Sequence, residues 1–429
     1  MTDGVAGLTP RERIRAIVAG SAGNLIEWFD FYVYAFTALY FAPAFFPDSD
    51  PLAQVIATSG IFAVGFLLRP VGGWFFGRYA DRHGRQKSMI LSVVLMGIGS
   101  ALIACVPTYA QVGAVAPALL LVGRMVQGFS TGGEYGAAAT YLSEVAVAGR
   151  RGFYASFQYV TLIGGQLLAT ALVLVLQHVL SPDDMRDWGW RLAFAIGAVG
   201  AALVLLLRRG MPETTTAEQR GAAAGTIAAL RHHIPAFLTV LGLTAGGSLF
   251  FYTFTTYMQK YLVLTTGLDK GAATLVMTAV LVPFMLLQPL FGLLADRIGR
   301  RANLVAFGAL ATIATVPLLS ALATASSGLV AFALVLTALA INALYTSISG
   351  LFKAELFPVH VRALGVGLAY GIGNAVFGGT AENIALAFKS AGHEHWFYWY
   401  VTAICAVSFL TAILMRDSRR DNALEDVDG

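Results

Sequence analysis

The chain has 429 residues, of which 57% are hydrophobic and only 12% are charged, and its formal net charge is +4. Soluble domains contain about 25% charged residues, so this chain has too little polar surface to cover a soluble globule. The composition also excludes a disordered chain, a disulfide scaffold and a nucleic-acid-binding protein, and it predicts a membrane protein with many spans.

Twelve apolar runs follow one another along the chain, each near the length of about 20 residues that a helix needs to cross the hydrocarbon core. The runs are continuously apolar and do not alternate, which predicts helices rather than barrel strands. We therefore expect an all-α membrane protein with twelve transmembrane helices. The runs are 15–41, 54–78, 88–107, 115–142, 152–179, 190–208, 233–262, 271–294, 303–323, 328–352, 361–388 and 395–415.

The positions of Lys and Arg predict the orientation of these helices. If the N-terminus is cytoplasmic, most of the 28 cations, including Arg208 and Lys353, fall on the cytoplasmic side. Only Arg69 and Arg124 then lie well inside the runs, away from the run ends. We expect both termini in the cytoplasm, so the basic charge reflects topology and not a nucleic-acid partner.

The longest cytoplasmic segment divides the runs six and six. This organisation predicts an N-terminal six-helix bundle over 1–208, a cytoplasmic linker over 209–232, and a C-terminal six-helix bundle with a short cytoplasmic tail over 233–429.

An internal duplication supports this division. Gly77-RYADRHGRQK follows the second run and Gly292-LLADRIGRRA follows the eighth, so that Asp81 and Asp296 occupy corresponding positions. A second pattern, an acid followed seven residues later by Arg, also recurs in the same order. The rule that cytoplasmic loops are basic explains the repeated cations but not the repeated Asp and Gly. Related halves are typical of secondary transporters, whose site lies near the midplane between them.

These loops carry a cluster of residues that we predict to form a cytoplasmic gate. An acid at the inner end of a helix can cap a neighbouring helix N-terminus and pair with the following Arg, while Gly84 and Gly299 permit the tight turn. The predicted gate residues are Gly77, Asp81, Arg82, Gly84, Arg85, Glu144, Arg151, Asp296, Arg297, Gly299, Arg300, Glu355 and Arg362.

The G-x-x-x-D-R-x-G-R loop is typical of the major facilitator superfamily, and the chain resembles that superfamily throughout. The resemblance implies the major facilitator fold of two pseudo-symmetric six-helix bundles. It also implies that the loop cluster latches the cytoplasmic side when the opposite side is open.

A narrower resemblance covers nearly the whole chain. GNLIEWFDFYVYAF (23–36), FLLRPVGGWFFGR (66–78), GRMVQGFSTGGEYGAAATYLSE (123–144) and RGFYASFQYVTLIGGQ (151–166) resemble the metabolite:proton symporter subfamily, whose members carry 2-oxoglutarate, citrate, shikimate, or proline and betaine. FYTFTTYMQKYLV (251–263), SISGLFKAELFPVHVRALGVGLAY (347–370) and HWFYWYVTA (395–403) are similar to its bacterial 2-oxoglutarate permeases.

This resemblance implies a multi-pass protein of the bacterial inner membrane that imports 2-oxoglutarate together with protons by alternating access. The alternative is proton symport of another organic acid or of a zwitterion, such as citrate, shikimate, proline or betaine. We expect a monomer in the lipid bilayer, with no cofactor and no metal. The chain shows no nucleophile elbow, P-loop or metal-ligand cluster, so an enzyme or an ATP-driven pump is unsupported. Short tails argue against a receptor, and saturable uptake would exclude a channel.

Ionisable residues inside the runs are the candidate site. Each costs roughly 2.5–3.5 kcal/mol on insertion scales, so it is a functional hypothesis by default. Asn24, Glu27, Asp30 and Tyr34 share one helix face, and Arg124, Gln127, Thr131 and Glu134 share another. Glu382 is a further case in the eleventh run.

A dicarboxylate at the midplane needs cations at its ends. We predict that Arg69 receives one carboxylate and that Arg124 receives the other or holds Glu134; alternatively these charges only pair with each other, for instance Arg69 with Asp30. Hydrogen bonds to the substrate are predicted from Tyr34, Gln158, Tyr159, Gln166, Tyr252, Tyr257 and Asn374, although simple packing is the alternative for the aromatic residues.

Proton coupling is assigned first to Asp30, with Glu27 and Glu134 as alternates. Entry of a divalent anion against an inside-negative potential requires co-transported protons. Lys260, near the outer end of the seventh run, either attracts anions or extends its ammonium to the membrane surface.

Overall fold

The computed structural model describes residues 10–47, 49–146, 149–209, 213, 215, 220, 224–325 and 327–415. The side chains of residues 10–17 are not among them, so the predicted cytoplasmic Arg11, Arg13 and Arg15 lie outside the described side chains. Residues 210–212, 214, 216–219 and 221–223 of the predicted linker, and the predicted tail from 416 onward, lie outside as well.

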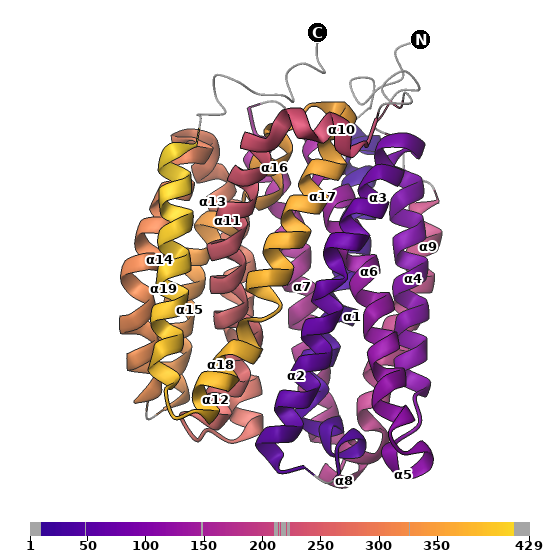
Figure 1. Ribbon diagram of the computed structural model, residues 1–429, viewed down its shortest axis with the longest axis vertical. Helices are drawn as coiled ribbons and strands as arrows, with labels where there is room; N and C mark the ends of the chain where they lie inside the picture. The colour runs from indigo at the N-terminus through magenta and orange to yellow at the C-terminus, as the bar shows by residue number, and fades with distance from the viewer. Residues whose placement is uncertain are drawn as a thin grey trace.

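Every regular element in the described ranges is a helix, and the helices run roughly parallel in one bundle (Figure 1). In chain order they are α1 (Pro10–Phe45), α2 (Pro51–Leu67), α3 (Arg69–His83), α4 (Arg85–Cys105), α5 (Tyr109–Val112), α6 (Val115–Glu144), α7 (Arg151–Val179), α8 (Pro182–Asp184), η2 (Met185–Gly189), α9 (Trp190–Arg208), α10 (Ile227–Leu230), η3 (Arg231–His233), α11 (Ile234–Tyr252), η4 (Thr253–Tyr257), α12 (Met258–Leu264), α13 (Lys270–Ile298), α14 (Arg300–Ala323), α15 (Gly328–Thr346), α16 (Ser349–Glu355), η5 (Val359–Val361), α17 (Arg362–Gly373), η6 (Asn374–Gly378), α18 (Ala381–Ser390) and α19 (Glu394–Leu414).

The helices account for twelve transmembrane positions. Ten helical stretches of the described chain are long and apolar enough to span a membrane. The first and fourth positions are taken by α1, with 36 residues, and α6, with 30, which fall outside that criterion but match the predicted runs. The all-α membrane architecture predicted from the apolar runs is therefore confirmed.

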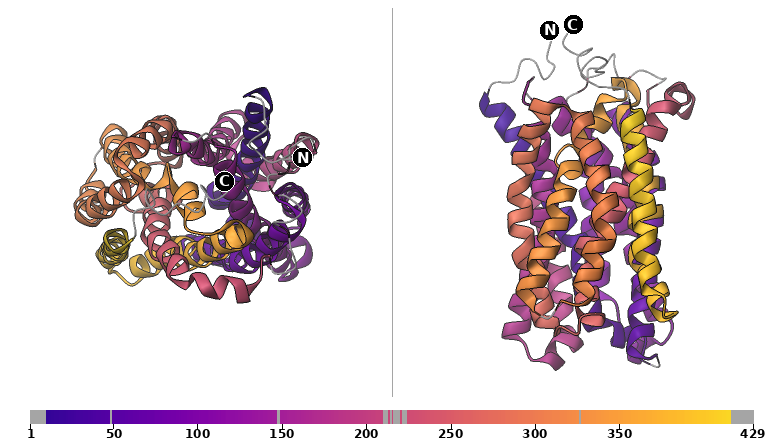
Figure 2. Two further views of the ribbon diagram at one scale, coloured as in Figure 1. Left: turned by 90° about the horizontal axis from the view of Figure 1, so that it is seen from above. Right: turned by 90° about the vertical axis from the view of Figure 1, so that its left-hand side faces the viewer.

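Two faces join the N-terminal six positions to the C-terminal six. Along one face α7 packs on α13, and along the other α3 and α6 pack on α17. Figure 2 shows the two groups of helices side by side when the bundle is viewed from above. The fifth position thus contacts the eighth, and the eleventh contacts the second. Because the second position corresponds to the eighth and the fifth to the eleventh, the same pair of contacts occurs twice, as expected for two duplicated halves.

Four of the positions are interrupted within their membrane-spanning length. The second breaks at Leu68, between α2 and α3, because Pro70 has no N–H to continue the backbone hydrogen bonds of the helix. The seventh and eleventh contain the π-helical turns η4 and η6, and the tenth breaks between α15 and α16. Irregular backbone at this depth is tolerated where protein covers it, so these breaks mark the covered interior between the halves.

Close backbone approach explains the four-residue glycine repeat of α6. A Cβ at Gly136 would lie 2.7 Å from the Cα of Gly367 in α17, and Gly128 and Gly132 lie against the carbonyls of Gly65 and Arg69. Small residues at helix interfaces allow such contacts in membranes. The face therefore fixes α6 against the broken second position, directly beside Arg69.

Candidate functional site

The two signature loops meet at one end of the bundle, which we call the motif end and which lies near α10 and α16 in Figure 1. The Asp81 carboxylate accepts hydrogen bonds from the backbone amides of Ala363 (3.3 Å) and Leu364 (3.0 Å) at the start of α17. It also pairs with Arg85. An acid of the first half therefore caps a helix of the second half, where the helix dipole favours negative charge.

The second loop makes the reciprocal contact. Asp296 accepts hydrogen bonds from the amides of Gly152 (2.8 Å) and Phe153 (3.0 Å), at the start of α7. Arg300 lies 3.7 Å from the Asp296 carboxylate. Gly84 and Gly299 adopt φ values of 104° and 99°, which only glycine adopts without strain.

The repeated acid-and-arginine pattern completes the motif end. Glu144 lies 3.0 Å from Arg362 and 3.5 Å from Arg85, and Glu355 lies 3.3 Å from Arg300. Arg82 donates to the Ala224 carbonyl at 3.1 Å. The other predicted gate residues lie at the same end of the bundle: Gly77 of α3 packs on Ala363 and Leu364, Arg151 begins α7, and Arg297 follows Asp296.

A second set of contacts joins the halves at the opposite end. Lys260 of α12 lies 2.9 Å from Glu382 of α18, and Glu382 also accepts a hydrogen bond from Ser59 of α2. The Lys260 ammonium lies 3.4 Å from the Ala35 carbonyl in α1. Of the two expectations for Lys260, extension to the membrane surface is wrong, because the side chain is buried against Glu382.

Arg69 lies between these two ends, at the interface of the halves. It is fully buried, and its Nη1 donates to the Tyr252 hydroxyl of α11 at 3.3 Å. The guanidinium carbon lies 3.8 Å from the Phe66 ring and 4.3 Å from the Phe31 ring. Its Nε and Nη2 have no hydrogen-bond partner within the described residues. The expected alternative of a pair with Asp30 is therefore not observed.

Arg124 is the second buried cation without a carboxylate partner at ion-pair distance in the described chain. Its Nη1 donates to the Gln127 side chain at 2.6 Å, and the guanidinium carbon lies 4.4 Å from the Tyr34 ring. Nε and Nη2 are again without a hydrogen-bond partner among the described residues. Both arginines are thus buried with donors that no described residue uses.

The three predicted coupling acids have different surroundings. Asp30 accepts hydrogen bonds through one oxygen from Ser100 and from Gln127 (3.3 Å), and its second oxygen has no partner in the described chain. Neither oxygen of Glu27 has a hydrogen-bond partner there. All three carboxylates are buried.

Glu134 is bound by Arg208 and not by Arg124, so the expectation that Arg124 holds Glu134 is wrong. Arg208 donates to both Glu134 oxygens, one of them at 3.0 Å, and Ser92 donates at 2.7 Å. The sequence placed Arg208 on the cytoplasmic side because it ends the sixth run. Its long side chain instead reaches inward from the last turn of α9.

The predicted hydrogen-bonding residues divide into two groups. Tyr252 contacts Arg69, and the Asn374 amide donates to the Tyr370 hydroxyl at 3.1 Å. The side-chain amides of Gln158 and Gln166 are buried with donors unused by the described residues. Of the remaining aromatic residues, Tyr34 lies against Arg124 and donates its hydroxyl to the Thr58 carbonyl. Tyr159 packs on Phe251 and Tyr257 packs on Phe397.

Lys353 is a central cation that the sequence did not identify. It was counted as cytoplasmic because the tenth run was ended at residue 352, but it is fully buried in α16. The expectation that Arg69 and Arg124 are the only cations at depth is therefore wrong. A signal for its burial was available in the sequence. Ser349 and Lys353 are four residues apart and so share one face of a helix that continues to Glu355.

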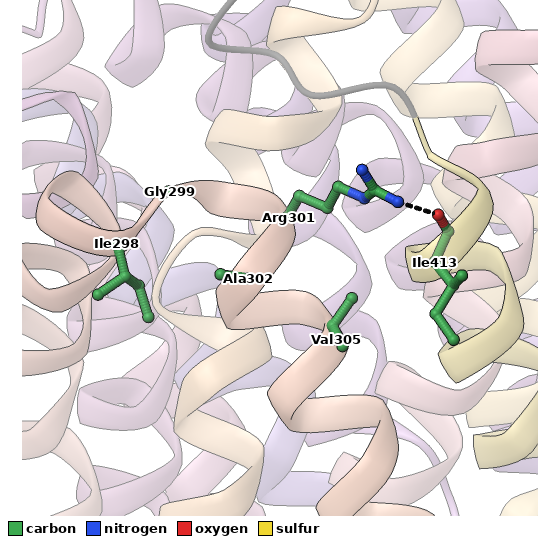
Figure 3. A pocket seen from close by; sticks show the side chains of 6 residues that line it. All are labelled: Ile298, Gly299, Arg301, Ala302, Val305 and Ile413. Atoms are coloured by element: carbon green, nitrogen blue, oxygen red, sulfur yellow. Dashed lines mark hydrogen bonds between the residues drawn. The ribbon is translucent and has the colours of Figure 1, made fainter.

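A surface hollow of about 340 Å³ at the motif end is separate from these charges. Ile298, Gly299, Arg301, Ala302, Val305 and Ile413 line it. Figure 3 shows Arg301 extending across the hollow toward the Ile413 carbonyl. The hollow contains none of the buried acids or cations described above.

Comparison with known proteins identifies the family. The family model described as "Sugar (and other) transporter" matches residues 16–231, and that described as "Major Facilitator Superfamily" matches residues 258–427. Alpha-ketoglutarate permease of Escherichia coli (strain K12) is 58% identical over 406 residues, which cover 94% of both chains. The citrate-proton symporter of Klebsiella pneumoniae is 34% identical over 95% of this chain and 93% of that protein.

Solved structures share the fold. The proton:xylose symporter XylE, bound to 6-bromo-6-deoxy-D-glucose, matches with a TM-score of 0.78 at 20% identity, over 98% of this chain and 99% of that chain. A partially occluded inward-open form of the E. coli xylose transporter XylE matches with a TM-score of 0.73 at 21% identity, over 94% and 97%. This chain therefore belongs to the major facilitator superfamily, and within it to the group of membrane transporters that includes alpha-ketoglutarate permease and the citrate-proton symporters.

Proposed function

We propose that this protein is a proton-coupled symporter that imports 2-oxoglutarate by alternating access. The observation that carries the proposal is the pair of buried arginines, Arg69 and Arg124, neither of which has a carboxylate of the described chain within 4.0 Å. A buried charge without a partner costs several kcal/mol, and a dicarboxylate substrate supplies the missing negative charges. The 58% identical relative named alpha-ketoglutarate permease supports 2-oxoglutarate as that dicarboxylate.

Arg69 is the proposed main substrate residue. It begins α3, twelve residues from Asp81, which places it about 18 Å of helix away from the motif end. Tyr252 of the other half contacts the same guanidinium. A carboxylate bound to the free Nε and Nη2 would therefore lie against both halves, which is the position that alternating access requires.

A short chain of hydrogen bonds supports coupling through Asp30. Gln127 donates to Asp30 and accepts from Arg124, so it lies between the acid and the cation. A carboxylate that bound Arg124 would compete with the Gln127 side-chain oxygen for the guanidinium. A displaced Gln127 side chain would then no longer donate to Asp30 in the same way, and the ionised form of Asp30 would be stabilised less. Glu27 is the second candidate, and Glu134 is the weakest because Arg208 already neutralises it.

The contacts at the two ends provide the gates. We propose that the motif end faces the cytoplasm, in agreement with the distribution of Lys and Arg, and that the protein works as a monomer in the bacterial inner membrane. The capping contacts of Asp81 and Asp296 would then break for inward opening. For outward opening, the contacts of Glu382 with Ser59 and of Lys260 with the Ala35 carbonyl, which join the two halves, would break.

Uptake of radiolabelled 2-oxoglutarate by proteoliposomes, with and without an imposed pH gradient, tests this function. We expect saturable uptake that exceeds equilibrium only with the gradient, because each charge moved against the potential costs about 2.3 kcal/mol per 100 mV. Competition by citrate, shikimate, succinate and proline distinguishes the alternative substrates. Uptake of citrate, shikimate or proline in preference to 2-oxoglutarate would assign the protein to that substrate and overturn ours.

A further inference from the structure

Lys353 is a buried cation to which the proposed function gives no role. Its Nζ donates to the Tyr135 hydroxyl at 2.8 Å and to the Ser349 hydroxyl at 2.6 Å. An ammonium has three N–H donors, so one donor has no described partner. Across the described chain, no carboxylate oxygen lies within 4.0 Å of this nitrogen. The charge is therefore buried without a counter-ion.

Four aromatic rings surround the ammonium. Its nitrogen lies 4.5 Å from the Tyr370 ring centroid, 4.8 Å from that of Tyr135, and 5.4 Å from those of Tyr345 and Phe352. Such cation–π contacts attract the charge but are weaker than a hydrogen-bonded carboxylate in the same place. The cage keeps Lys353 in position while leaving it able to bind an anion.

The position of Lys353 complements that of Arg69. Helical side chains lean toward the helix N-terminus, so the ammonium lies at the level of Ser349, about 9 Å of helix from Glu355. Arg69 lies farther from the motif end. One turn of α17 contacts both residues: the Tyr370 ring lies against the Lys353 ammonium, and a Cβ on the next residue, Gly371, would lie 3.0 Å from the backbone carbonyl oxygen of Arg69.

The cage also crosses the interface of the halves. Tyr135 belongs to α6 and Tyr370 to α17, and their rings stack at 3.4 Å. Lys353 itself belongs to the C-terminal half, whereas Arg69 belongs to the N-terminal half. An anion held by both cations would therefore connect the two halves.

We propose that Lys353 is a substrate-binding residue that receives one carboxylate of a dicarboxylate whose other carboxylate lies at the arginine end of the site, where the guanidinium carbons of Arg69 and Arg124 lie 4.3 Å and 4.6 Å from the same Phe31 ring. This inference rests on the proposed function and adds the source of its selectivity. The free N–H of Lys353 binds the carboxylate, and the Tyr135 and Ser349 hydroxyls hold the ammonium when substrate is absent. A monocarboxylate engages only one cation, so Lys353 determines the preference for two carboxylates.

Transport by the full chain in proteoliposomes tests the role. Lys353→Met retains the length of the side chain and removes its charge, and Lys389→Met, which removes a partly exposed lysine paired with Glu394 in the same half, is the control. We expect Lys353→Met to raise the KM for 2-oxoglutarate about 10-fold to 100-fold, the size of a lost charged hydrogen bond. Inhibition by 2-oxopentanoate, the analogue with one carboxylate, should stay unchanged, and the control should behave as wild type.

A purely structural role predicts a different result. In that case Lys353→Met would lower the maximal rate without altering the preference for 2-oxoglutarate over 2-oxopentanoate, and this outcome would overturn the proposal. Because an uncompensated charge is removed, we expect the unliganded variant to be at least as heat-stable as wild type in detergent, and to lose the stabilisation that 2-oxoglutarate gives.

A measurement on the wild type keeps the test independent of whether the variant folds. Saturating 2-oxoglutarate should slow chemical acylation of Lys353, followed by mass spectrometry, while 2-oxopentanoate should not. Equal acylation rates with and without 2-oxoglutarate would overturn the inference. Absence of saturable 2-oxoglutarate uptake by the wild type would overturn the proposed function itself, whereas normal wild-type uptake with unaltered Lys353→Met kinetics would overturn only the role of Lys353.

Discussion

The ion pair of Glu134 and Arg208 allows a structural acid to be separated from a coupling acid. The two side chains are 1% and 0% exposed, and Arg208 donates to both carboxylate oxygens. Removing one partner of such a buried pair costs about 3–5 kcal/mol, because the remaining charge has no counter-ion. Glu134→Gln leaves Arg208 without a carboxylate at ion-pair distance in the described chain, and an arginine cannot release its proton. We therefore predict a loss of unfolding free energy of that size.

The complementary change should cost less. In Arg208→Met the isolated Glu134 can take up a proton and become neutral. The folded state of this variant then binds more protons than the unfolded state, so its stability decreases as pH rises. The double variant removes both charges of the pair and retains the Ser92 hydrogen bond, so it should be more stable than Glu134→Gln alone.

Unfolding of the purified variants by SDS in mixed micelles, followed by circular dichroism between pH 5 and pH 8, measures these differences. Asp183→Asn is the control, because its pair with Arg186 is loose at 3.8 Å and its side chain is 90% exposed; surface pairs contribute about 0–1 kcal/mol. If Glu134→Gln unfolds like wild type and loses only uphill uptake, Glu134 acts in proton coupling and our reasoning is wrong.

Two further predictions concern coupling and gating. Asp30→Asn keeps groups that can bond to Ser100 and Gln127 but has no proton to carry, so uphill uptake of 2-oxoglutarate should stop while exchange of labelled for unlabelled substrate continues; accumulation that survived the change would exclude Asp30 as the coupling group. Asp296→Asn weakens two charge-assisted bonds to the start of α7, each worth about 1.5–3 kcal/mol, so maleimide should label a cysteine introduced at Ser156 faster from the motif end. Unchanged labelling would contradict the latch.

The sequence predicted the fold from signals that are local or repeated. Twelve apolar runs need no knowledge of tertiary contacts, and the duplication located Asp81 and Asp296 at corresponding helix ends. The sequence does not show which helices these acids cap, because the partners are far apart along the chain: Asp81 and Leu364 are separated by 283 residues. That pairing became visible only when the second and eleventh positions were placed side by side.

The central cations show where the sequence was insufficient. Arg208 and Lys353 both fall at the edge of an apolar run, where positive-inside counting assigns a cation to the cytoplasm. The count does not consider that a side chain extends back along its helix or that a buried partner compensates its charge. Glu134 lies 74 residues from Arg208, and Tyr135 lies 218 residues from Lys353.

The duplication is retained at the motif end but not at the centre, and this difference has a physical reason. Both halves must release each other in the same motion, so matching caps by Asp81 and Asp296 let the two contacts break at similar cost. A substrate with two carboxylates and a separate proton has no such symmetry. The N-terminal half accordingly contributes Arg69, Arg124 and the buried acids, while the C-terminal half presents Lys353 within its tyrosine cage. A chain with identical halves could close its gates but could not distinguish the proton path from the anion path.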